Sequence, residues 1–187
     1  MNNPIVAWCN SSLIKFGDAS HPEVPSVIQF NDGTYGNSVL TDSDSAEVSI
    51  AITNNFNNGT ATADASYDMK NCSLTIKDTD GGMTDEIVQQ KWVRVFCQSK
   101  AETSANYTQI GAHLDASTWV EDSYPIGCGD ATVGANNISG AANDGTEAGT
   151  GKTNIARVTM KAHPDSAATP VKHSFKFRVV YTYGTGA

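Results

Sequence analysis

Leucine is scarce in this sequence. It occurs four times among 187 residues, whereas valine and isoleucine together number 25 and the aromatic residues number 15. Leucine favours helices, while valine, isoleucine, threonine and aromatic residues suit the pleated, half-buried surface of a strand. The composition therefore argues against a helical protein, and also against a doubly wound enzyme with its long leucine- and alanine-rich helices. An all-β fold with polar loops remains.

Long apolar runs are also missing. The longest run, near Ile5–Cys9, falls far short of the about 18 residues that indicate a membrane-spanning helix. The first residues, Met-Asn-Asn-Pro, show neither the basic nor the apolar region of a secretion signal. We therefore expect no membrane span. For the location of the protein, we expect one of two cases. A virion protein stays where it is made until lysis and needs no signal, and an extracellular protein would have had its signal removed.

Basic residues are missing from two long stretches of the chain. Residues 1–69 carry eight acids and only Lys15, and residues 101–151 carry seven acids and no lysine or arginine. Residues 152–187 carry a net charge of +5, although the whole chain has −8. We expect no nucleic-acid binding, because phosphate contacts need a basic face. Such segregation is typical of solvated strand faces, and it would also suit a basic edge that meets an acidic surface on another subunit.

Catalytic motifs are absent as well. The four histidines lie in no H-E-x-x-H pattern, and no G-x-S-x-G nucleophile elbow occurs. The stretch Gly149–Thr153 looks like the end of a phosphate-binding loop, but the first glycine of that motif is replaced by Thr146. An alternating strand, rather than the required helix, is expected to follow it. We predict that the protein is not an enzyme and has no organic cofactor.

Alternation of apolar and polar residues is the clearest pattern that the sequence does contain. In the last segment, one parity is occupied by Phe175, Phe177, Val179, Tyr181 and Tyr183. This spacing predicts a half-buried strand with these five side chains toward the core. Similar patterns predict strands over residues 48–52, 67–77, 91–98 and 156–162.

The segment 67–77 changes face along its length. Tyr67 and Met69 share one parity, whereas Cys72, Leu74 and Ile76 share the other. A β-bulge produces such a switch inside one strand, because it inserts an extra residue. We therefore predict a bulge in this strand.

Turn signals rich in glycine and in asparagine or aspartate separate the predicted strands, at residues 31–33, 58–59 and 80–82. Strands spaced by about ten residues with such turns are typical of sandwiches and barrels. We predict one domain over residues 1–187, an antiparallel β-sandwich with the jelly roll as a variant. One long loop rich in glycine, alanine and asparagine, Gly127–Lys152, is expected to be functional or mobile.

Four acidic residues cluster around a pair of glycines: Asp78, Asp80, Asp85 and Glu86. Carboxylate oxygens are the ligands that calcium prefers, so these residues are candidates for a calcium site. The EF-hand pattern fails, since Gly82 stands where it needs an aspartate or asparagine. The alternative interpretation is an acidic hairpin turn in water.

The four cysteines, Cys9, Cys72, Cys97 and Cys128, show no C-x-x-C spacing, which argues against a zinc or thioredoxin-type site. Cys72 and Cys97 lie in predicted strands, where a buried free thiol acts as a small hydrophobic residue. We expect this pair to be reduced. The sequence leaves open whether Cys9 and Cys128 are cross-linked.

The N-terminal segment, residues 1–12, is a candidate extension or exchanged strand. It lies ahead of the first clear turn and contains the apolar residues Ile5, Val6 and Trp8. A strand of this kind can pair with an exposed sheet edge of another subunit. These three residues are therefore our candidates for assembly contacts.

Together these features predict a non-enzymatic structural subunit that associates with itself or with other structural subunits. Among such subunits we favour a bacteriophage virion protein, for head decoration or for the tail. One alternative is a subunit of an extracellular filament. Another is a carbohydrate-binding sandwich module, in which exposed aromatic rings stack on sugars: Tyr35, Tyr107, Trp119 and Tyr124.

Overall fold

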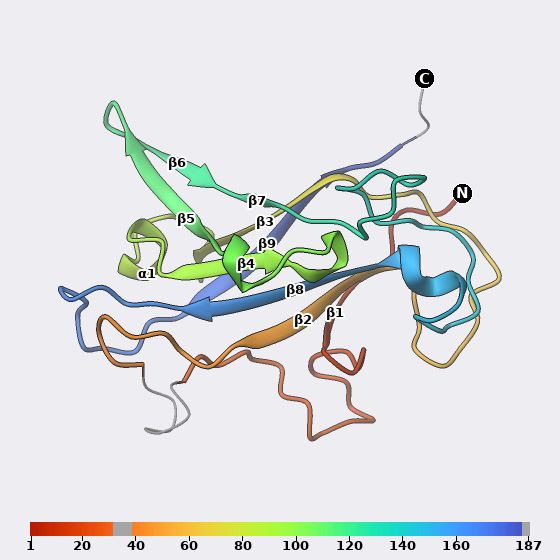
Figure 1. Ribbon diagram of the computed structural model, residues 1–187, viewed down its shortest axis with the longest axis horizontal. Coiled ribbons are helices and arrows are strands. Elements are labelled where there is room, and N and C mark those ends of the chain that lie inside the picture. Colours follow the sequence, from red (N-terminus) through yellow and green to blue (C-terminus); the bar gives the residue numbers. More distant parts are fainter. Residues whose placement is uncertain (32–38, 185–187) are drawn as a thin grey trace.

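Two antiparallel sheets make up the protein in the computed structural model, which describes residues 1–31 and 39–184 (Figure 1). Within these residues the strands are β1 (Val6–Asn10), β2 (Val48–Asn54), β3 (Lys70–Asp78), β4 (Val93–Cys97), β5 (Thr108–Asp115), β6 (Thr118–Asp122), β7 (Tyr124–Pro125), β8 (Ile155–Ala162) and β9 (Phe175–Thr182). The helical elements described are α1 (Glu86–Gln89) and the 3-10 helices Gln98–Lys100, Ser104–Asn106 and Thr150–Asn154. The all-β prediction is confirmed. The turn predicted at 31–33 extends outside the described residues.

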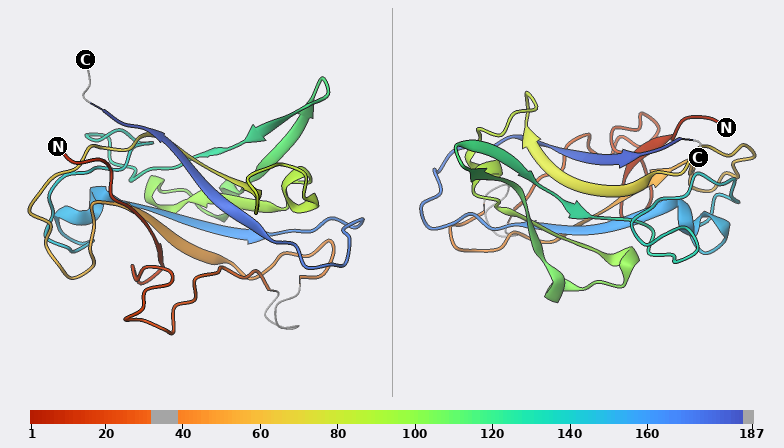
Figure 2. Two further views of the ribbon diagram at one scale, coloured as in Figure 1. Left: turned by 180° about the vertical axis from the view of Figure 1, so that it is seen from behind. Right: turned by 90° about the horizontal axis from the view of Figure 1, so that it is seen from above.

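The strands divide unequally between the two sheets. Among the described residues, the first sheet has six strands in the order β1-β2-β8-β4-β5-β6, and the second has three in the order β7-β3-β9. All paired strands are antiparallel. The sheets form the two layers seen in Figure 2, so the predicted antiparallel sandwich is confirmed. A jelly roll, in comparison, distributes eight strands over two sheets.

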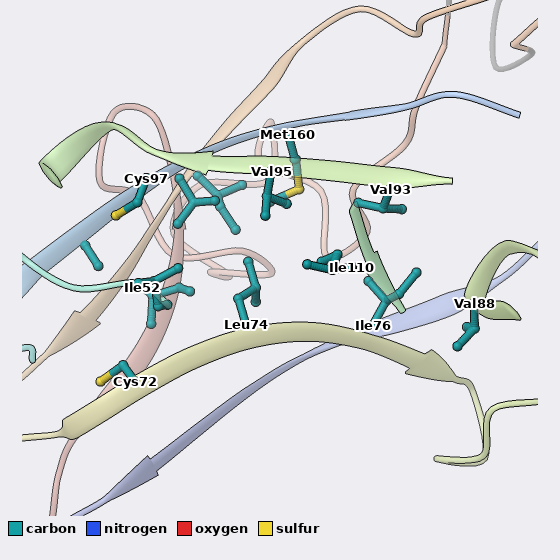
Figure 3. Close-up of a cluster of buried hydrophobic side chains, with 14 of the residues drawn as sticks. Ile52, Cys72, Leu74, Ile76, Val88, Val93, Val95, Cys97, Ile110 and Met160 are labelled. Carbon is teal, nitrogen blue, oxygen red and sulfur yellow. The ribbon is translucent and has the colours of Figure 1, made fainter. Parts of the chain in front are cut away.

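The main hydrophobic core lies between the two sheets (Figure 3). Ile52 from β2, Leu74 and Ile76 from β3, Val95 from β4 and Met160 from β8 are fully buried there. Burying a side chain of this size stabilises the fold by about 1.5–3 kcal/mol. Valine and isoleucine fill most of these positions because their stiff, branched side chains pack well on a pleated sheet. The scarcity of leucine thus reflects the sheet architecture.

β3 contains the predicted bulge. Its pairing with β9 shifts register between Lys70 and Ser73, and Asn71 between them has a left-handed backbone with φ of 52°. Asparagine adopts this conformation more readily than most residues. The shift explains the change of face in the sequence, since Met69 and Cys72 are both buried.

β9 shows the predicted alternation. Phe175, Phe177, Val179 and Tyr181 are partly buried and pack against the core, and the residues between them are exposed. Tyr183 differs from the prediction, because it follows the end of the strand and is 50% exposed. No side chain of β9 is fully buried, whereas the neighbouring β3 supplies fully buried residues to the core.

The long loop Gly127–Lys152 is held against the rest of the fold. Ile138 forms an antiparallel bridge with Met69, and its side chain is fully buried. The loop packs so closely that a Cβ atom on Gly140 would lie 2.3 Å from the backbone oxygen of Ser66. Glycine is needed at this position because no larger residue fits.

The two sides of the sandwich differ. On one side the chain passes from β6 in the first sheet directly to β7 in the second, and the Thr75 hydroxyl donates to the carbonyl of Asp122 at 2.7 Å. On the other side β1 and β9 are the edge strands of their sheets. They are joined there by a ring contact between Trp8 and Phe177, whose centroids lie 6.4 Å apart.

Candidate functional site

The first half of the predicted acidic cluster shapes the turn that follows β3. The Asp78 carboxylate accepts hydrogen bonds from the Thr84 N–H at 2.6 Å, the Thr84 hydroxyl at 2.8 Å and the Asp85 N–H at 3.0 Å. Asp80 accepts from the Gly82 N–H at 2.9 Å. Burial alone would raise the pKa of Asp78, but the hydrogen bonds from Thr84 and Asp85 lower this pKa below its ordinary value.

The second half of the cluster holds the loop between β8 and β9. Asp85 caps α1 by accepting from the Ile87 N–H at 3.1 Å, and its other contact is Nδ1 of His173 at 2.9 Å. Glu86 accepts from the Thr169 N–H at 3.2 Å. These two acids therefore fix the loop that leads into β9.

The structure offers no metal centre within the residues it describes. No group of three or more His, Cys, Asp or Glu side chains lies close enough together to hold an ion among residues 1–31 and 39–184. Asp78, Asp80, Asp85 and Glu86 instead accept hydrogen bonds from nearby protein groups. These hydrogen bonds correspond to the alternative interpretation of the cluster, an acidic turn.

All four cysteines are free and buried. Burial raises the pKa of Cys72 to about 12, and it also raises the pKa values of Cys9, Cys97 and Cys128. The thiolate is the reactive form of cysteine, so thiols with raised pKa values are weak nucleophiles. They act as small core side chains.

Neither of two surface hollows in the described part of the chain places an activated nucleophile beside a base. One, of about 530 Å³, is lined by Phe16, Val48 and residues 25–29, which include no acid, base or thiol. The other, of about 340 Å³, contains Cys128, Asp130 and Lys152 in its lining. Its Asp130 carboxylate already accepts from the N–H and hydroxyl of Thr132. Nucleophilic catalysis needs an activated nucleophile beside a base, which these linings do not supply.

The three described members of the aromatic set predicted to bind sugars, Tyr107, Trp119 and Tyr124, each have other partners and form no ring contact with one another. Tyr107 packs edge-on against Phe96 and donates to Glu47, whereas Tyr124 donates to Glu102. Trp119 packs against the main core. Tyr35 lies outside the described residues. The tyrosines that do form a row are Tyr67, Tyr181 and Tyr183, with neighbouring centroids 6.1 and 6.3 Å apart.

The predicted N-terminal assembly segment forms an edge strand of the chain's own sheet. β1 pairs with β2 from Val6 to Asn10. Its outer edge is partly covered, because the Phe16 N–H donates to the Trp8 carbonyl at 3.0 Å. Val6 and Trp8 pack against the main core, while Ile5 is 54% exposed. Of the three assembly candidates, Ile5 remains free on the surface.

The outer edge of β9 has unpaired backbone groups. In antiparallel pairs, residues alternate between bonding their neighbour and pointing away from it. On β3, Cys72 directs its backbone groups away from β9, toward Asn136 and Ile126, and the Asp78 N–H donates to Gly82. By this alternation, the β3 residues that bond to β9 are Ser73, Thr75 and Lys77.

These three residues are paired with Val180, Arg178 and Lys176 of β9. The intervening residues of β9 therefore point their N–H and C=O groups away from β3: Phe175, Phe177, Val179 and Tyr181. None of these groups has a backbone hydrogen-bond partner elsewhere among the described residues. We call this row of groups the β9 edge.

The exposed face of β9 beside this edge is basic but partly neutralised. Arg178 lies 3.1 Å from the Glu121 carboxylate, which also contacts Lys77 at 2.8 Å. Lys176 lies exposed on the same face.

The alternation of β9 could be predicted from the sequence. Its position at the edge of the sheet could not, because that position depends on which strands become its neighbours.

Within the described residues, no helix has the length and apolar character needed to cross a membrane. No family model, no curated protein and no solved structure matches this chain.

Proposed function

We propose that the protein is a non-enzymatic structural subunit that associates with further copies of itself, in a bacteriophage virion as a head-decoration or tail protein. The observation that carries this proposal is the β9 edge. Proteins that stay monomeric usually keep edge strands short or cover them, because free N–H and C=O groups are a template for another strand. β9 is eight residues long, and its inward side chains are partly exposed.

The rest of the molecule supports a structural role over an enzymatic one. The hollow lined by Cys128, Asp130 and Lys152 contains a thiol whose pKa is raised by burial, so that thiol is a weak nucleophile. The net charge of −8 favours partners other than nucleic acid. Association through a sheet edge needs neither a cofactor nor a metal ion.

Sedimentation velocity over a wide range of protein concentration tests self-association, and negative-stain microscopy shows its form. We expect the weight-average mass to rise with concentration, and discrete oligomers to appear on the grid. Long fibres would favour the extracellular filament and would require a second contact surface besides the β9 edge. A monomer at every concentration would contradict the proposal.

Carbohydrate binding is a second candidate, which the row of Tyr67, Tyr181 and Tyr183 favours. Aromatic faces stack on the apolar faces of sugars, and Tyr183 is 50% exposed. Titration with a panel of oligosaccharides tests this candidate. Binding that Tyr183→Ala abolishes would favour a binding module over a structural subunit.

A further inference from the structure

We propose that two copies of the chain pair their β9 edges in antiparallel fashion about a two-fold axis at Val179. The pairing would join the two three-stranded sheets into one continuous sheet of six strands. This inference rests on the proposed function and names the contact through which the copies associate. A two-fold interface must be self-complementary, since the same surface meets itself.

The backbone of β9 meets this requirement. Antiparallel residues exchange hydrogen bonds where both members of a pair point toward each other. With the axis at Val179, Phe177 lies opposite Tyr181 of the second copy, and Phe175 lies opposite its Tyr183. Phe175, Phe177, Val179 and Tyr181 are the residues whose N–H and C=O groups lack partners in the monomer as described. The pairing therefore satisfies the whole β9 edge.

The charges on the exposed face select this position of the axis. Arg178 then lies opposite Val180 of the second copy, and Lys176 lies opposite its Thr182, so each cation meets an uncharged residue. An axis at Arg178 would place two arginines opposite each other, and an axis at Phe177 would place Lys176 opposite Arg178. Like charges directly opposite each other destabilise a strand pair. The ion pair between Arg178 and Glu121 further reduces repulsion across the interface.

The inward side chains complement each other in the same arrangement. Phe177 faces Tyr181 of the second copy, and Phe175 faces Tyr183, which gives cross-strand aromatic pairs. An axis at Val180 would also separate the cations, but it places Thr185 instead of an aromatic residue opposite Phe175. The proposed axis thus accounts for Tyr183, which continues the aromatic alternation beyond the end of β9 and is 50% exposed.

Cysteine cross-linking of the full chain tests the axis. Val179→Cys places the two thiols across a hydrogen-bonded pair with Cα atoms about 5.5 Å apart, within the range of a disulfide. Arg178→Cys is the matched control, because its copies would lie diagonally, about 7–8 Å apart. We expect mild oxidation to yield a covalent dimer of Val179→Cys, and no dimer of Arg178→Cys or of the unmodified protein. Cross-linking of Arg178→Cys to the same extent, or of neither variant, would overturn the inference.

A pair of charge variants tests the contact independently. Val180 is 37% exposed on the outer face, so a charged residue there is compatible with folding. Val180→Glu would face Arg178 of the second copy and should lower the dimer Kd by about 2- to 30-fold, since the pair occurs twice. Val180→Lys should raise the Kd by a similar factor. Sedimentation equilibrium measures both.

The outcomes separate this inference from the proposed function. If the unmodified protein self-associates and its Kd is unchanged in both Val180 variants, the copies meet through another surface and the inference fails alone. If the unmodified protein is monomeric at every concentration, both the inference and the proposed function fail.

Discussion

The side-chain amide of Asn154 donates to the backbone carbonyl of Asn54, 100 residues earlier in the chain, at 3.0 Å. Both residues are fully buried. The same Nδ2 atom donates to the carbonyls of Ser139 and Ala141 at 3.0 and 2.9 Å. One side chain just before β8 therefore connects β2 with the long loop Gly127–Lys152.

Replacing Asn154 with alanine should lower the free energy of unfolding by about 2–3 kcal/mol, because buried carbonyl groups lose their donor. Asn58 is the control, since its amide donates to the Ser12 carbonyl at an exposed site. Asn58→Ala should change stability by no more than about 0.5 kcal/mol. Urea unfolding measures both variants. Equal losses would show that the buried position of Asn154 is not what makes its hydrogen bonds important.

The alternation of β9 should appear as a graded loss of stability. Phe177→Ala should cost about 2–3 kcal/mol, below the 3–5 kcal/mol of a fully buried ring, since Phe177 is partly exposed. Lys176→Ala, on the exposed face, should change stability by no more than about 0.5 kcal/mol. Thermal and urea unfolding at a concentration where the protein is monomeric check both values. A larger loss of stability from Lys176→Ala than from Phe177→Ala would contradict the orientation of the strand.

The bulge in β3 gives a test of backbone conformation. Asn71 has φ of 52° and an exposed side chain. Asn71→Gly should leave stability within about 0.5 kcal/mol of the unmodified protein, because glycine adopts positive φ freely. Asn71→Val should cost about 1–2 kcal/mol, because a branched residue is strained in the left-handed region. A stable Asn71→Val variant would mean that the bulge can rearrange.

The stability of the protein should fall in acid, and Asp78 should contribute to that fall. Its pKa is lowered in the folded state. The stability it supplies is therefore complete above its unfolded pKa of about 3.9 and is lost as the pH falls through the lower folded pKa. Asp78→Asn should be less stable at pH 7, and its stability should depend less on pH below about pH 4. Urea unfolding at several pH values checks this, and parallel curves for the two proteins would refute it.

The strands could be predicted because their signal is local. The alternation of Phe175, Phe177 and Val179, and the change of parity between Met69 and Cys72, each occupy a few residues of sequence. Both patterns are present in the structure, because a pleated strand has a period of two whatever its neighbours are. The bulge could be foreseen for the same reason.

The candidate site depends on long-range pairing, which local patterns do not reveal. Asp85 looked like a cation ligand because other acids adjoin it in sequence, yet its partner is His173, 88 residues away. Trp8 looked available for assembly, yet it contacts Phe177 on the last strand. In each case the deciding neighbour comes from a distant part of the chain. The open edge of β9 became visible once the order of the strands was known.

The pairing of β3 with β9 also has a consequence for biosynthesis. β3 pairs with β9, for example at Lys77 and Lys176. The partner strand of β3 is therefore translated long after β3 itself. Contacts between residues so far apart in sequence form slowly, because a long loop must close first. The nascent chain therefore contains β3 without its β9 partner until residues 175–182 emerge. During that interval the unpaired edge of β3 and its apolar residues Leu74 and Ile76 make the chain more prone to aggregation.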